Sequence, residues 1–134
     1  MFNLRAWSKR PLIVGAAIVA IIVTGLIHLV QGPQQYTEVP YVGILFYLNG
    51  AGAAIAAYGI YRDAKTWGWG LGMLIAGGAM ALYIVSRTVG LPGMDVQEWG
   101  EPIGLLSLIV EGLFLGLSVA YLRRSPAPRT LQTS

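Results

Sequence analysis

The sequence predicts an all-α membrane protein, an up-down bundle of four transmembrane helices with the N- and C-termini in the cytoplasm. Of the 134 residues, 55% are hydrophobic and only 11% are charged, whereas soluble domains carry roughly 25% charged residues. Four apolar runs each have about the 20 residues that a helix needs to cross a bilayer. The basic residues, finally, gather on alternate connections between these runs.

The four runs form one membrane domain, 12–122, with predicted helices at residues 12–30, 41–61, 67–86 and 103–122. The first follows a basic leader, 1–11. Its apolar part is longer than that of a signal peptide and no small-residue cleavage site follows, so we expect a retained helix. The last segment, 123–134, is basic and contains prolines. We expect it to be a cytoplasmic tail that touches anionic lipid headgroups.

The stretch SRTVGLPGMDVQEWGEP, 86–102, separates the third and fourth helices. Gly90 and Pro92 break the third helix and turn the chain. Pro102 suits the first turn of the fourth helix, where its missing N–H costs nothing. Glu98 and Glu101 precede that helix, and the positive end of its dipole favours acids there. An acidic helix cap therefore explains the acids, but it leaves Arg87 unexplained.

Small residues recur on every predicted helix and permit close helix packing in lipid. Three stripes with a spacing of four are Ala16, Ala20, Thr24; Gly68, Gly72, Ala76; and Gly112, Gly116, Ala120. Short connections make consecutive helices antiparallel neighbours. Because one small bundle hardly needs so many small residues, we expect some of these faces to contact other membrane subunits or a second copy.

Charge distribution predicts the orientation of the bundle. With four crossings, eight of the nine basic residues fall on the side of the termini, and Arg87 alone falls on the other side. Excess Lys and Arg in short connections mark the cytoplasmic face, so we expect a multi-pass protein of the bacterial plasma (inner) membrane. The predicted outer connections carry four of the six acids, Glu38, Asp95, Glu98 and Glu101.

Polar residues inside a membrane are costly and are therefore candidates for function. By helix rise, Glu111 lies roughly 13 Å and Asn49 roughly 12 Å from the outer surface. Ser107 lies one turn from Glu111 on the same helix face. The predicted polar site is a column of seven residues, His28, Asn49, Tyr83, Arg87, Glu101, Ser107 and Glu111.

Glu111 has three interpretations. Burial favours the neutral acid, which would bond to Asn49 or to a backbone carbonyl and hold the bundle together. The carboxyl could instead carry a proton or a cation, or it could pair with Arg87. Arg87 in turn could extend to the interface or pair with Glu101 or Glu111.

His28, the single histidine, could bond to a neighbouring helix, relay protons, or ligate a metal, haem or chlorin. Thr24, one turn earlier, would let a flat macrocycle approach. We predict no cofactor, and haem or chlorin through His28 stays an alternative. Met94, His28 and the outer acids lack a tight ligand spacing for copper or another cation, so the metal remains unknown.

Several function classes are excluded. A chain without cysteine forms no disulfide and has no thiol nucleophile. Phosphate-binding loops, zinc-site spacings and hydrolase motifs are absent. The excess of basic residues reflects membrane orientation, so we predict no nucleic-acid partner. No catalytic residue is predicted, and we expect the protein not to be an enzyme.

The segments HLVQGPQQYTEVPYVGILFYLNG (28–50) and YIVSRTVGLPGMDVQEWGEPIGLLSLIVEGLF (83–114) together resemble a family of small bacterial four-helix membrane proteins. That pattern has a His before a short outer loop, a Tyr-x-Glu, a Ser-Arg-Thr-x-Gly-Leu-Pro-Gly turn and a Glu in the last helix. The matching positions are His28, Tyr36, Glu38, Ser86, Arg87, Gly90, Pro92, Gly93, Glu101 and Glu111. The resemblance implies the fold and these residues, and no activity. Met94 and Asp95 depart from the pattern, which argues against a metal site in the loop.

The first function that we expect is a non-enzymatic accessory or structural subunit, packed in a larger membrane complex or a homo-oligomer. His28, Arg87, Glu101 and Glu111 would then form a buried polar lock. One alternative is a small proton- or cation-coupled transporter that uses Glu111 in an outward-facing cavity. Another is a subunit that binds haem or a pigment through His28.

Overall fold

The computed structural model describes residues 4–64 and 66–124, with side chains for 12–64 and 66–123. These residues form four helices, α1 (Leu4–Glu38), α2 (Pro40–Tyr61), α3 (Trp67–Thr88) and α4 (Pro102–Arg124). Each helix contains a segment that is long and apolar enough to cross a membrane. The all-helical prediction and the number of such segments are therefore confirmed.

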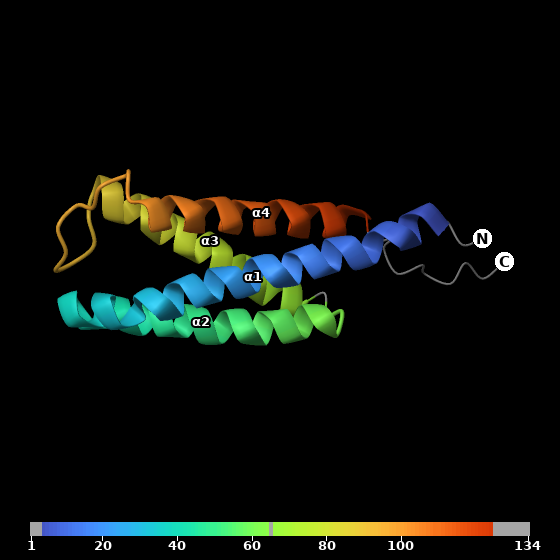
Figure 1. The fold of residues 1–134 in the computed structure, drawn as a ribbon, viewed down its shortest axis with the longest axis horizontal. Coiled ribbons are helices and arrows are strands. Elements are labelled where there is room, and N and C mark those ends of the chain that lie inside the picture. Colours follow the sequence, from blue (N-terminus) through green and yellow to red (C-terminus); the bar gives the residue numbers. More distant parts are fainter. Residues whose placement is uncertain (1–3, 65, 125–134) are drawn as a thin grey trace.

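The helices alternate in direction, so the start of α1 and the end of α4 lie at one end of the molecule (Figure 1). We call this the terminal end. The opposite end, which holds the α1–α2 and α3–α4 connections, is the loop end. Helix α1 packs mainly against α2 and α4, and α3 packs against the same two helices. The four helices thus form a ring in chain order.

Helix α1 continues through residues 31–38, where the sequence predicted a connecting segment. Close contacts with α2 favour the longer helix: a Cβ atom on Gly32 would lie 2.8 Å from Cε1 of Tyr47. The connection to α2 is a single residue, Val39, with an extended backbone (φ −141°, ψ 101°). Pro40 follows it, and the residue before a proline avoids the helical conformation. Val39, the residue before Pro40, therefore leaves the helical conformation, and α1 ends at Glu38.

The turn between α2 and α3 lies at the terminal end and depends on two glycines. A Cβ atom on Gly68 would lie 2.8 Å from Cα and 2.9 Å from the carbonyl oxygen of Gly59. The two backbones therefore touch, and a side chain at either position would separate the helices. Asp63 adopts a left-handed conformation (φ 55°) in this turn, and its Oδ1 accepts a hydrogen bond from the hydroxyl of Tyr121 at 2.6 Å.

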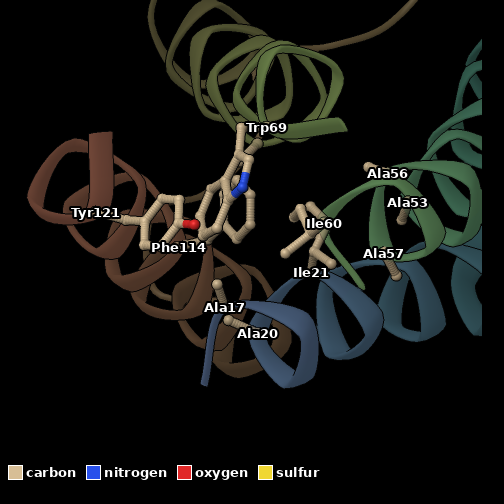
Figure 2. Packing of buried hydrophobic residues seen from close by; sticks show 11 residues of the cluster. Ala17, Ala20, Ile21, Ala53, Ala56, Ala57, Ile60, Trp69, Phe114 and Tyr121 are labelled. Carbon is tan, nitrogen blue, oxygen red and sulfur yellow. The ribbon is translucent and has the colours of Figure 1, made fainter. Parts of the chain in front are cut away.

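The hydrophobic core fills the half of the bundle near the terminal end. Trp69 of α3 stacks on Tyr121 of α4, with ring centroids 4.5 Å apart, and lies near Phe114 at 6.4 Å. Figure 2 shows these rings beside Ile21 and Ile60. Trp69, Phe114 and Ile21 are completely buried. This packing closes the terminal half of the bundle.

The predicted small-residue stripes have different environments. Gly68, Gly72 and Ala76 are buried in the bundle, and Gly72 leaves room for the ring of Phe114. On α4, in contrast, a Cβ atom added at Gly112 or Gly116 would meet nothing within 4 Å. The α3 stripe therefore serves packing within the chain, whereas open space surrounds the Cβ positions of the two α4 glycines.

Candidate functional site

A cavity of about 270 Å³ occupies the loop half of the bundle, and all four helices contribute to its walls. All seven residues of the predicted polar site line it, namely His28, Asn49, Tyr83, Arg87, Glu101, Ser107 and Glu111. The predicted outer acids Glu38, Asp95 and Glu98 are exposed and are not among its lining residues. The structure therefore brings the intramembrane polar residues together and leaves these three acids outside.

Glu111 and Asn49 are buried polar groups of the cavity, with exposed fractions of 2% and 8%. Ser107, one turn away on α4, donates a hydrogen bond from Oγ to Oε1 of Glu111. The other carboxyl oxygen, Oε2, and the amide oxygen of Asn49 have no hydrogen-bond partner within the described part of the chain. Buried oxygens without a partner are costly, so both favour a ligand that brings hydrogen-bond donors.

His28 is held by its own helix rather than by a neighbouring one. Its Nδ1 lies 2.8 Å from the carbonyl oxygen of Thr24, and its ring is tilted against Phe46 of α2 with centroids 4.9 Å apart. A carbonyl oxygen only accepts, so Nδ1 carries the proton and, in the neutral ring, Nε2 is left as an acceptor or a metal ligand. This orientation suits both a hydrogen-bonded ligand and the haem or chlorin alternative.

Arg87 lies at the loop end of the cavity and makes several contacts. Its Nη2 lies 3.4 Å from Oε2 of Glu101. Nη1 donates to Oγ of Ser86 at 2.7 Å, and Nε donates to the carbonyl oxygen of Glu98 at 3.1 Å. The guanidinium also stacks over the ring of Tyr83, at 3.6 Å from its centroid. Of the partners left open by the sequence, Arg87 therefore has Glu101.

The α3–α4 connection is held against the helices by hydrogen bonds that the sequence did not indicate. Tyr41 of α2 donates to the carbonyl oxygen of Pro92 at 2.6 Å, and Tyr83 donates to that of Trp99 at 3.2 Å. The backbone N–H of Gln97 donates to the carbonyl oxygen of Ser86 at 2.8 Å. Gly90 has a positive φ of 83°, which explains why glycine stands at this turn.

Apolar side chains form one edge of the cavity. Four leucines line it and are also exposed on the surface, Leu45 and Leu48 of α2 and Leu74 and Leu82 of α3. Leu48 and Leu74 are 59% and 69% exposed. Since these residues belong to facing helices, the cavity opens sideways between α2 and α3, where a membrane would provide acyl chains. Acceptor groups inside and leucines at this opening suit an amphipathic ligand.

Several polar cavity residues were not predicted from the sequence. Gln31 and Gln35 of α1 and Gln97 of the connection also line the cavity. Gln31 and Gln35 lie three and seven residues after His28, a spacing that places residues on one helix face. This signal depends on α1 continuing beyond residue 30, so an expected loop concealed it.

Metal coordination by a cluster of side chains finds no support in the part of the chain that is described, since no three His, Cys, Asp or Glu residues gather there. Comparisons of the chain with family models, curated proteins and solved structures give no match.

Proposed function

We propose that the protein is a small proton-coupled cation carrier of the bacterial plasma membrane, without enzymatic activity, and that Glu111 binds the cation. The observation that carries this proposal is the carboxyl oxygen Oε2 of Glu111, buried in the cavity without a hydrogen-bond partner among the described residues. A carboxylate in such a place is unstable unless a proton or a cation accompanies it. Glu111 would therefore exchange the one for the other.

The other deep groups favour a cation over an anion. Asn49 presents a second buried oxygen without a partner among the described residues. Ser107 donates to Oε1 of Glu111, so Oε2 is the carboxyl oxygen left to accept from a ligand. Arg87 is the single Lys or Arg side chain among the cavity residues, and the carboxylate of Glu101 is its ion-pair partner. An anion would find no uncompensated positive charge, whereas a cation would find two partnerless oxygens.

The two halves of the bundle suit a carrier better than a channel. The cavity lies in the loop half, and the terminal half is filled by the buried cluster around Trp69 and Phe114. Carriers expose a central site to one side at a time. The positive-inside rule favours cytoplasmic termini, so the cavity would face the outside in this conformation.

Proton release on cation binding tests this proposal directly. Purified protein in weakly buffered detergent solution should release up to about one proton per chain when sodium, potassium or an alkylammonium chloride is added. Glu111→Gln should release none, because the amide has no proton to exchange. The control Glu38→Gln changes an exposed acid outside the cavity and should behave as the wild type. If no cation releases protons, or if Glu111→Gln releases as many, the proposal is wrong.

An accessory or structural subunit is the second candidate, favoured by the unused glycine face of α4. Open space surrounds the Cβ positions of Gly112 and Gly116, and such faces pack closely against other helices in lipid. Purification from the host in mild detergent should then recover larger subunits or a homo-oligomer, and Gly112→Leu should lose them. A wild-type monomer without partners would exclude this role. A visible absorption band that disappears in His28→Ala would instead indicate haem or a pigment.

A further inference from the structure

We propose that the cation is a lipophilic primary amine, whose ammonium group binds Glu111 and Asn49 while its apolar part lies at the opening between α2 and α3. This inference rests on the proposed exchange at Glu111 and names the class of substrate. It is carried by three features of the cavity: its oxygen acceptors, its leucine edge and the charge at the loop end.

The oxygen acceptors distinguish a primary ammonium group from other cations. Oε2 of Glu111 and Oδ1 of Asn49 are both more than nine-tenths buried and lack hydrogen-bond partners within the described residues. An ammonium group has three N–H donors, enough for both oxygens, and both residues line the same cavity. A quaternary ammonium has the same charge but no donor, so it would leave both oxygens unpaired.

The leucine edge distinguishes a lipophilic amine from an inorganic cation. An alkali ion gains nothing from apolar walls, yet Leu48 and Leu74 line the cavity from two helices and are largely exposed. Phe46, packed on His28, adds an apolar surface inside. The volume of about 270 Å³ lies just below the usual range of roughly 300–1,000 Å³ for ligand pockets. The cavity therefore holds a head group and a few carbons, and a longer chain would extend into the lipid.

Charge at the loop end favours the approach of cations. Three acids and one base lie in or beside the α3–α4 connection at this end, Asp95, Glu98, Glu101 and Arg87. An excess of negative charge near an entrance raises the local concentration of cations. Arg87 does not oppose the bound amine strongly, because its guanidinium is paired with Glu101 and stacked on Tyr83.

The exchange step involves no change in the amine itself. A protonated amine enters, the carboxyl proton of Glu111 leaves to the water at the loop end, and an ammonium–carboxylate pair remains. The titratable cavity residues of the packed elements are His28 of α1, Tyr83 and Arg87 of α3 and Glu101 before α4, while α2 offers the neutral Asn49. Protons compete with the amine for the Glu111 carboxylate. In the pH range where Glu111 is protonated, the apparent affinity for the amine should therefore fall by about tenfold for each unit by which the pH is lowered.

Isothermal titration calorimetry on the full chain in lipid nanodiscs tests the substrate class, with empty nanodiscs as the baseline. Hexylammonium should bind, and hexyltrimethylammonium should bind roughly tenfold to a hundredfold more weakly because its head group has no donors. Methylammonium, with the same donors but no chain, should bind at least about tenfold more weakly. Sodium and potassium should bind more weakly than hexylammonium.

Two neighbouring glycines of α3 provide a matched pair of variants. A Cβ atom at Gly77 or Gly78 would meet nothing within 4 Å, so both positions have the same open space where a side chain would begin. Only Gly78 lines the cavity. Gly78→Leu should therefore fill the cavity and reduce hexylammonium affinity at least about tenfold, while Gly77→Leu should bind as the wild type does.

The outcomes separate this inference from the proposed function. If sodium or potassium releases protons through Glu111 but hexylammonium does not bind, the cation carrier stands and the amine is wrong. Equal binding of hexyltrimethylammonium and hexylammonium would also overturn the inference, since donors would then not matter. Unchanged affinity in Gly78→Leu would place the amine outside this cavity. If no cation binds and no proton is released, both proposals fail.

Discussion

Arg87 shows how the chain accommodates a charged side chain at the end of a membrane-spanning helix. The guanidinium donates to Ser86, to the carbonyl oxygen of Glu98 and to Glu101, and its flat face covers Tyr83. Donors on three separate nitrogens, held in one plane, and a flat face for stacking are properties of arginine that lysine lacks. Arg87 therefore attaches the α3–α4 connection to the helix end by its shape as much as by its charge.

Replacing Arg87 with lysine should lower stability although the charge is kept. Lysine cannot maintain both the Ser86 and Glu98 hydrogen bonds or the stacking on Tyr83, so we expect a loss of about 1–3 kcal/mol. Thermal unfolding in detergent would measure it. Glu101→Gln should cost less than about 1 kcal/mol, because its ion pair is long and half-exposed. Equal losses for the two variants would mean that charge pairing, not hydrogen-bond geometry, holds the connection.

At the scale of the helices, glycines that all lie within helices differ in how closely other residues approach them. Gly59 and Gly68 allow α2 and α3 to touch at the terminal end, and Gly72 makes room for Phe114. Gly70, which lies between Gly68 and Gly72 in the sequence, has open space at its Cβ position. Sequence patterns show that all are small, but only the packing shows which of them are required.

Gly68→Ala and Gly70→Ala should therefore differ sharply in stability. An added Cβ at Gly68 would press on the backbone of Gly59 and separate the helices, which we expect to cost about 1–3 kcal/mol, as overpacking does. Gly70→Ala should be neutral or stabilise by up to about 1 kcal/mol, because alanine favours the helix. Chemical denaturation in mixed micelles would compare them. If both variants were neutral, the α2–α3 contact would not be tight.

For the whole molecule, the division into a closed terminal half and an open loop half determines from which side the cavity is accessible. The stacked rings of Trp69, Tyr121 and Phe114 belong to the terminal half, and the cavity belongs to the loop half. Access from outside the cell therefore requires cytoplasmic termini. This orientation is predicted by the distribution of Lys and Arg and calls for its own measurement.

Single cysteines can measure the orientation because the chain contains none. Glu38 at the loop end and Arg62 at the terminal end are both exposed. A membrane-impermeant maleimide added to intact spheroplasts should label Glu38→Cys and leave Arg62→Cys unlabelled until the cells are broken. The reverse pattern would place the cavity on the cytoplasmic side. Labelling of both in intact cells would contradict a chain with one fixed orientation.

The sequence by itself determined the class of fold and indicated several of the polar residues that line the cavity. Apolar runs of about 20 residues form helices in lipid whatever their neighbours, because backbone groups must pair within the segment. The same scarcity of charge made Glu111, Asn49 and Arg87 conspicuous. All three line the one cavity described above, and helix periodicity had already placed Ser107 beside Glu111.

Only the tertiary structure decided how these residues are arranged. The extension of α1 to Glu38 depends on contacts of Gly32 with Tyr47 of another helix. The pairing of Arg87 with Glu101 depends on the path of the α3–α4 connection. The opening between α2 and α3 depends on how the helices are rotated about their axes. Local sequence encodes the helices and their polar positions, whereas contacts between residues distant in the chain set rotation, register and the shape of the cavity.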